Sequence, residues 1–237
     1  RTPSIVFFND RLMITVQNLT KTYTNGEIET HVLKGLDLEI RQGEFVAIMG
    51  KSGAGKSTFL YQMSLLDMPT SGSITIGDTD ILAMTQPERT MFRLDRLGYI
   101  FQDYALVPEL TAEENVAVPL LMQGMDQGEA IEKARLIIDS VGMAGKYGNR
   151  PNQLSGGEQQ RISVARAIVQ QPEILFADEP TANLDSTSSE SVIELLRDLH
   201  RNGQTIVMVT HEPEYTRFCD RVIYLEDGVI TNYDYQV

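Results

Sequence analysis

Three things are scarce in this chain: cysteine, positive charge and long apolar runs. Cys219 is the only cysteine among 237 residues, so an internal disulfide and a Cys-x-x-Cys metal or redox site are both excluded, which indicates a reducing compartment. The longest apolar runs, such as residues 45–49 and 174–177, are far below the roughly 18 residues that a membrane helix needs. We therefore expect no segment to span a bilayer.

The shortage of positive charge excludes a class of partners. The chain has 20 lysines and arginines against 33 aspartates and glutamates, a formal net charge of −13. Proteins that bind nucleic acid or an anionic lipid surface carry a basic patch, so no nucleic acid is expected as a partner. An anionic ligand must instead be held by a few local groups. With 42% hydrophobic and 22% charged residues, the chain is expected to bury a sizeable core.

What the chain does have is an alternation of strand and helix patterns, which predicts an α/β fold. Its 237 residues suit one large domain or one domain with an insertion. Residues 1–12 contain no long apolar stretch, so we expect no secretory signal there, only an N-terminal extension, an expression remnant or the edge of a longer chain. Residues 13–237 then form the domain.

Two departures from simple alternation are predicted within the domain. Residues 13–19 and 32–40 alternate apolar and polar side chains, which is typical of antiparallel strands. Residues 103–153 carry apolar side chains at helical spacing without a strand pattern, so we interpret them as an inserted helical subdomain between core segments 13–102 and 154–237. The core is expected to contain strands at 44–49, 72–77, 97–101, 174–177 and 205–210, helices at about 56–66, 156–170, 188–201 and 213–218, and a final hairpin around Asp227 and Gly228.

Residues 50–57 read GKSGAGKS and match the pattern G-x-x-x-x-G-K-[ST] between a predicted buried strand and a predicted helix. Glycines let backbone N–H groups approach a triphosphate, and the following helix adds its dipole. Lys56 would neutralise the β- and γ-phosphates, and the Ser57 hydroxyl would ligate Mg²⁺. The alternative is a chance glycine turn. At average amino-acid usage, this pattern would arise by chance in a chain of this length on the order of 1% of the time. The predicted nucleotide contacts here are Gly50, Lys51, Ser52, Gly53, Ala54, Gly55, Lys56, Ser57 and Thr58.

A second charged motif, ILFADEP, ends a hydrophobic strand at residues 174–180. In phosphate-loop enzymes a strand-end aspartate beside the loop holds Mg²⁺, and Asp178 fits that role. Glu179 is then free to orient the water that attacks the γ-phosphorus and to accept its proton. Two solvated acids in a turn would be the preferred interpretation if the phosphate loop were absent.

The segment LSGGEQQR at residues 154–161 precedes a strongly periodic helix. Ser155 and Glu158 have the spacing of a capping box, and a purely structural helix start is the simplest interpretation. Gly156 and Gly157 add a second feature, because glycines are costly in a first turn and leave its N–H groups uncovered. We therefore interpret this helix start as a place that a second anion can approach.

The order of these motifs, with LSGGEQQR between the phosphate loop and the strand-end acids, resembles the ATP-binding-cassette (ABC) ATPases over Met13–Tyr233. The resemblance implies a P-loop NTPase core with an N-terminal antiparallel β layer and an inserted α-helical subdomain. It also implies hydrolysis of ATP with Mg²⁺ as cofactor. Residues 66–72, 101–120 and 183–186 are most similar to the lipoprotein-release and macrolide-export group, followed by importers of polar amino acids.

The resemblance also implies roles that spacing alone does not give. Tyr23 stands where the family stacks an aromatic ring on adenine, with an ordinary hairpin tyrosine as the alternative. Gln102 matches a glutamine that contacts Mg²⁺ and water, Asp185 ends a loop that crosses to the other subunit, and His211 matches a histidine that touches the γ-phosphate. The predicted catalytic residues are Lys56, Gln102, Glu179 and His211, the metal ligands Ser57, Gln102 and Asp178, and the cross-subunit contacts Ser155, Gly156, Gly157, Glu158 and Asp185.

The assembly implied by the resemblance is a head-to-tail dimer with each ATP between the phosphate loop of one copy and the LSGGEQQR helix of the other. The expected partner is an integral membrane permease, which would hold the chain at the cytoplasmic side of the membrane. A regulatory ABC module with little or no transport is the main alternative. DNA-repair and ribosome-acting ABC proteins fit poorly with a charge of −13. Lys51, Ala182 and Glu158 depart from the family pattern, and Lys51 could alter nucleotide affinity.

Overall fold

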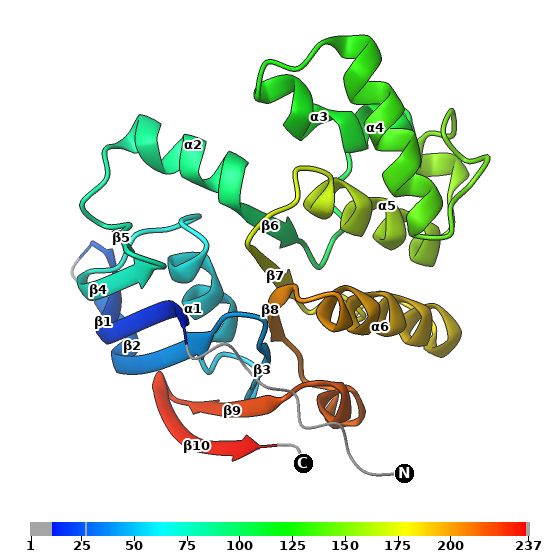
Figure 1. Ribbon diagram of the computed structural model, residues 1–237. Helices are drawn as coiled ribbons and strands as arrows, with labels where there is room; N and C mark the ends of the chain where they lie inside the picture. Colours follow the sequence, from blue (N-terminus) through cyan, green and yellow to red (C-terminus); the bar gives the residue numbers. More distant parts are fainter. Residues whose placement is uncertain (1–10, 27, 236–237) are drawn as a thin grey trace.

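The computed structural model describes residues 11–26 and 28–235 (Figure 1). Residues 1–10 of the expected N-terminal segment 1–12 lie outside the described residues, and the first strand begins at Leu12. The described chain forms two sheets, one antiparallel and one mostly parallel, with helices around them.

The smaller sheet is antiparallel and comes from the N-terminal third of the chain. Ile14 pairs with Ile40 on one neighbouring strand and with Ile76 on the other, and all three side chains are buried on the same face. The predicted antiparallel layer is therefore confirmed, although its hairpin is longer than predicted. In the order β2-β1-β4-β5, the sheet contains β1 (Leu12–Asn25), β2 (Ile28–Arg41), β4 (Ser71–Ile76) and β5 (Thr79–Asp80).

The larger sheet has six strands in the order β10-β9-β3-β8-β7-β6, all parallel except β10 at one edge. Every residue of β3, β7 and β8 is buried. Strands with such continuous apolar runs are covered on both faces. The strands are β3 (Phe45–Met49), β6 (Leu97–Ile100), β7 (Ile174–Asp178), β8 (Thr205–Val209), β9 (Arg221–Glu226) and β10 (Val229–Tyr235).

Strand β3 lies between two hydrophobic cores and contributes to both. Phe45, Ala47 and Met49 pack into a cluster with helices of the 112–168 region, whereas Val46 and Ile48 face a cluster with the antiparallel sheet. This division follows from the two-residue period of a strand. The parallel sheet is therefore the layer that joins the rest of the molecule.

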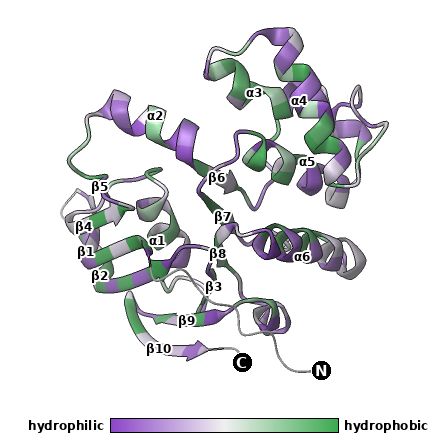
Figure 2. Cartoon of the chain, viewed as in Figure 1, coloured by the Kyte–Doolittle hydropathy of each residue, from purple (hydrophilic) through white to green (hydrophobic). Residues whose placement is uncertain are grey.

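Helices cover the parallel sheet and extend beyond it. In Figure 1, α3 and α4 lie together at one end of the molecule and contact α5. Figure 2 shows hydrophobic and hydrophilic residues along these helices, as expected for helices buried on one side. The helices are α1 (Lys56–Met63), α2 (Gln86–Arg96), α3 (Ala112–Met122), α4 (Gln127–Ser140), α5 (Gly156–Ile168) and α6 (Ser186–Arg201), with 3₁₀ turns η1 (Pro151–Gln153) and η2 (Pro213–Phe218). No helix in the described part of the chain is long and apolar enough to cross a membrane.

Candidate functional site

The carboxyl ends of parallel strands are where open α/β sheets bind ligands. Strands β3, β8, β7 and β6 are neighbours in that order. The phosphate loop follows β3, His211 follows β8, Glu179 follows β7 and Gln102 follows β6. Motifs far apart in the sequence therefore meet at one edge of the sheet.

The phosphate loop connects β3 directly to helix α1. Gly50 passes so close to strand β9 that a Cβ atom there would lie 2.1 Å from the Leu225 carbonyl oxygen. Gly55 precedes α1 with φ 100°, a left-handed conformation, and no side chain caps the helix. The first N–H groups of α1 therefore remain available to an anion. The Lys56 ammonium donates to the Lys51 carbonyl at 3.2 Å and closes the loop.

A cavity of about 580 Å³ lies beside this loop. Glu179 stands between two cationic or titratable groups in it: one carboxylate oxygen is 3.9 Å from Lys56 Nζ and the other is 3.3 Å from His211 Nδ1. The structure thus brings together three of the four predicted catalytic residues. The lining residues are Met49, Gly50, Lys51, Ser52, Lys56, Glu179, His211, Tyr224 and Glu226, of which Met49, Tyr224 and Glu226 were not predicted.

Glu179 is held in a strained backbone conformation. Its φ is 45°, in the left-handed region that costs an ordinary residue about 1–2 kcal/mol. The Glu179 N–H donates to the Val209 carbonyl of β8 at 2.9 Å, which ties the residue to the neighbouring strand. Strain of this kind is characteristic of functional sites, where the surrounding structure enforces it.

Asp178 and Ser57 form the pair predicted to hold a metal ion. The Ser57 hydroxyl donates to Asp178 Oδ1 at 2.9 Å, and the aspartate is 4% exposed. Burial raises the pKa of the Asp178 carboxyl, the charge of Glu179 raises it further, and the hydrogen bond from Ser57 opposes the shift. Adjacent hydroxyl and carboxylate oxygens fit Mg²⁺, which takes one or two protein ligands plus phosphate and water. Within the described residues no three His, Cys, Asp or Glu side chains gather as a self-sufficient metal site.

Two tyrosines that the sequence did not single out also approach Asp178. The Tyr99 hydroxyl donates to Asp178 Oδ2 at 3.4 Å, and the Tyr61 ring lies 6.1 Å from the Tyr99 ring. Both hydroxyls lower the pKa of the Asp178 carboxyl. They come from β6 and α1, and no local pattern connects them to the aspartate.

Gln102 and Tyr23 lie outside the cavity lining. Gln102 is exposed, and its carbonyl accepts a hydrogen bond from Asn183 Nδ2 at 3.1 Å. Tyr23 on β1 is 43% exposed, and its hydroxyl donates to Asp67 Oδ2 at 2.8 Å. The predicted contacts of Gln102 with Mg²⁺ and of Tyr23 with adenine stay predictions.

The LSGGEQQR segment is the start of α5, and none of it is among the described residues lining the cavity. Ser155 and Glu158 form the predicted capping box, with reciprocal hydrogen bonds of 2.9 and 3.3 Å. Gly157 has a packing reason, because a Cβ atom there would lie 2.5 Å from Ser188 Oγ of α6. Asp185 caps α6 by accepting from the Ser188 N–H at 3.0 Å.

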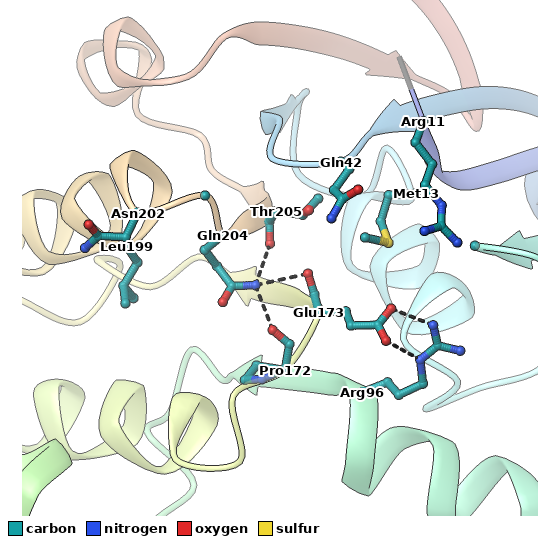
Figure 3. A pocket seen from close by; sticks show the side chains of 12 residues that line it. Arg11, Met13, Gln42, Arg96, Pro172, Glu173, Leu199, Asn202, Gln204 and Thr205 are labelled. Carbon is teal, nitrogen blue, oxygen red and sulfur yellow. Dashed lines mark hydrogen bonds and ion pairs between the residues drawn. The ribbon is translucent and has the colours of Figure 1, made fainter. Parts of the chain in front are cut away.

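A second cavity, of about 520 Å³, lies at the opposite, amino-terminal edge of the parallel sheet (Figure 3). Arg96 forms a two-pronged ion pair with Glu173 there, at 2.6 and 2.7 Å. The Gln204 amide donates to the carbonyls of Pro172, Glu173 and Thr205. These groups satisfy one another within the chain.

Comparison with known proteins identifies the family of this chain. The family model described as ABC transporter matches residues 33–182. MJ1508 of Methanocaldococcus jannaschii, an uncharacterised ABC transporter ATP-binding protein, is 44% identical over 218 residues, 92% of this chain and 97% of its own. The lipoprotein-releasing system ATP-binding protein LolD of Geobacter metallireducens is 44% identical over 217 residues, 91% of this chain and 96% of its own. The macrolide export ATP-binding/permease protein MacB of Aggregatibacter actinomycetemcomitans is 44% identical over 218 residues, 92% of this chain, which spans 34% of its length.

Solved structures of ABC proteins are similar to this chain as well. The dimeric structure of a post-hydrolysis state of the ATP-binding cassette MJ0796, bound to ADP and Pi, has a TM-score of 0.89 at 40% identity, covering 95% of this chain and 99% of that one. CbiO1 from Clostridium perfringens, part of the ABC transporter complex CbiONQ, has a TM-score of 0.84 at 26% identity, covering 96% and 90%. These matches confirm the predicted P-loop NTPase fold and the resemblance to the lipoprotein-release and macrolide-export group. The chain belongs to the ABC transporter family and carries its ATP-binding, ATP-hydrolysing domain.

Proposed function

We propose that two copies of this chain enclose two ATP molecules between them and, by hydrolysing them, power an export or envelope-extraction transporter. The observation that carries the proposal is the separation of two helix starts suited to phosphate. Helix α1 opens beside the cavity of Glu179, whereas α5 opens outside that cavity. A second copy, placed head to tail, would bring its α5 to the cavity, where Ser155, Gly156, Gly157, Glu158 and Asp185 would meet the nucleotide.

Each group in the cavity has a role that follows from its position. Lys56 and the α1 N–H groups hold the phosphates, because both present positive charge to the same space. Glu179 accepts the proton of the attacking water, since its carboxylate is held at the cavity by Lys56 and His211. His211, whose side chain is 55% exposed, would contact the γ-phosphate.

Ser57 and Asp178 would hold Mg²⁺, with Gln102 as the third ligand. The ion would neutralise phosphate charge as the bond to the γ-phosphorus breaks. A cation there would stabilise the ionised form of Asp178, which is a buried carboxyl with a raised pKa.

The type of transporter is inferred from the relatives. MacB is named as a macrolide export ATP-binding/permease protein, and LolD as part of a lipoprotein-releasing system. Their similarity supports a permease partner that exports or extracts a substrate. That permease would be a separate chain, as the length of LolD suggests, or a further part of a longer one, as in MacB, and it would hold this ATPase at the cytoplasmic face of the membrane.

The catalytic part of the proposal is tested by Glu179→Gln. We expect ATP turnover to fall at least about 10²-fold, because the proton acceptor is lost, while ATP produces a stable dimer on size-exclusion chromatography with light scattering. Glu226→Gln is the matched control, since it removes an exposed carboxylate from the same cavity and should leave turnover near normal. Normal turnover in Glu179→Gln would remove that residue from its role, and a chain that stays monomeric with ATP would contradict the dimer.

The partner is tested separately by pull-down from membranes with the Glu179→Gln chain and ATP. We expect an integral membrane permease to co-purify, and its helix count and external domain would separate an exporter from an importer or a regulator. Recovery of soluble proteins alone would contradict the transporter part of the proposal.

A further inference from the structure

The segment that follows Gln102 contains two consecutive strained residues. Tyr104 has φ 59° and Ala105 has φ 50°, and neither is glycine. Left-handed conformations of this kind persist only where other contacts enforce them. The contacts around these two residues therefore show what holds the Gln102 loop in place.

Helix α5 holds the backbone of this segment. The Arg166 guanidinium donates to the carbonyl oxygens of both strained residues, Tyr104 and Ala105. A rigid planar donor with several N–H groups can fix two adjacent carbonyls at once. The Gln102 loop is thus tied to the helix that begins with the LSGGEQQR segment.

The Tyr104 side chain connects the loop to a second segment. Its hydroxyl donates to the Asn183 carbonyl at 3.2 Å. Asn183 returns two hydrogen bonds, from Nδ2 to the Gln102 carbonyl at 3.1 Å and to Asp103 Oδ1 at 3.2 Å. These bonds close a ring between the Gln102 loop and the loop that leads to Asp185.

The same hydroxyl lies against the start of α5. A Cβ atom on Gly156 would be 2.9 Å from the Tyr104 hydroxyl and 3.7 Å from the Asn183 carbonyl oxygen. Gly156 is therefore the point where α5 leaves room for this contact. The Gln102 loop, α5 and the Asn183 loop therefore meet at one place. We call this place the Tyr104 junction, and it consists of Tyr104, Gly156, Arg166 and Asn183.

We propose that Tyr104 is a positioning residue: its hydroxyl fixes the Gln102 loop to the Asn183 loop and to the start of α5, so that the three segments move as one unit. The proposal rests on the proposed function in one respect, because the surfaces it keeps aligned are those offered to a second copy. A phenylalanine would keep the ring packing and lose only the hydrogen bond from the Tyr104 hydroxyl to the Asn183 carbonyl. The three segments would then reach the second copy with less order.

Hydrogen exchange on the nucleotide-free chain tests the junction without any dimer. Tyr104→Phe should make the backbone amides between residues 102 and 106 exchange about fivefold faster, the effect of losing one ordinary hydrogen bond, with the unfolding temperature almost unchanged. Tyr147→Phe is the matched control, because it removes another tyrosine hydroxyl, bonded to Asp139 of α4. Unchanged exchange at 102–106 in Tyr104→Phe, or the same acceleration in Tyr147→Phe, would overturn the proposal.

Dimerisation supplies a second measurement that a purely structural role would not move selectively. In the Glu179→Gln background with saturating ATP, Tyr104→Phe should raise the dimer dissociation constant about fivefold while leaving the affinity of the monomer for ATP unchanged. Equal losses in both quantities, or no loss in dimerisation, would overturn it. Failure of Glu179→Gln alone to dimerise would contradict the proposed function instead, and the exchange result would still decide the role of Tyr104.

Discussion

Asp178 is a residue at which the needs of the site oppose those of the fold. It is 4% exposed, and burial, followed by the charge of Glu179, raises the pKa of its carboxyl above the ordinary 3.8. The folded chain therefore binds this proton more tightly than the unfolded chain does, so the free energy of unfolding falls as the pH rises from the unfolded pKa through the folded one. Deprotonation of Asp178 therefore destabilises the nucleotide-free fold.

We expect Asp178→Asn to raise the unfolding temperature of the nucleotide-free chain at pH 7 while abolishing ATP turnover. A stabilising substitution contributes about 0.5–2 kcal/mol, which corresponds to about 2–4 °C for each kcal/mol in a domain of this size. The gain should shrink as the pH falls toward 3.8 and below it, because the wild-type carboxyl then becomes protonated in the unfolded state as well as in the folded one. Asp78→Asn, at an aspartate whose side chain is 95% exposed, should change nothing. A lower unfolding temperature in Asp178→Asn would mean that its hydrogen bonds outweigh the cost of burial.

At the scale of elements, the contact between α5 and α6 explains one of the two glycines of the LSGGEQQR segment. A Cβ atom on Gly157 would lie 2.5 Å from Ser188 Oγ and 2.7 Å from Ser188 Cβ. The sequence pattern predicts uncovered N–H groups at both glycines, but Gly157 is buried. Close packing of two helices is therefore enough to require glycine at this position.

We expect Gly157→Ala to lower the free energy of unfolding of the nucleotide-free chain by about 1–3 kcal/mol, the usual cost of overpacking. Urea unfolding measures the change. Gly148→Ala is the matched control, because a Cβ atom there meets nothing within 4 Å. Adding Ser188→Gly should restore part of the loss, since it removes both clashing atoms. A Gly157→Ala chain as stable as the wild type would return this glycine to a role in anion binding alone.

Elements were predictable where burial left a clear pattern of apolar residues in the sequence. The strands now seen as β3, β7 and β8 are continuous apolar runs and were placed to within one residue at each end. Helix α2 was not predicted, because it buries only Phe92 among its 11 residues and so lacks an apolar stripe. Its helix start is held instead by a capping box between Thr85 and Glu88, and Arg93 ties it to the Leu65 carbonyl.

The residues of the site likewise include some that the sequence predicts and some that it does not. The phosphate loop, Glu179 and His211 each follow a parallel strand, so their meeting is a consequence of topology that the sequence pattern already contains. The tyrosines at 99 and 104 could not be predicted, because each hydroxyl finds its partner 79 residues away in the sequence. Such contacts depend on how strand β6 and its following loop pack against β7 and α6, which no local spacing specifies.

For the whole molecule, the net charge of −13 bears on assembly. Two identical copies of this sign repel one another, and each additional ATP brings further negative charge. Lys56 and the two helix starts attract the phosphates at short range. They do not cancel the long-range repulsion between the two copies. Salt screens charges separated by more than about 10 Å at 0.1 M ionic strength, so it should reduce the repulsion between whole copies more than the close contacts around ATP.

We therefore expect the ATP-bound dimer of Glu179→Gln to tighten as salt is added. Between about 0.05 M and 0.3 M KCl its dissociation constant should fall at least about threefold, because the Debye length shortens over this range. Analytical ultracentrifugation with saturating ATP and fixed Mg²⁺ measures the constant without interference from weaker ATP binding at high salt. An uncharged osmolyte at matched osmolality is the control and should not reproduce the effect. A dissociation constant that rises with salt would mean that attractive ion pairs between the copies outweigh the repulsion of their total charge.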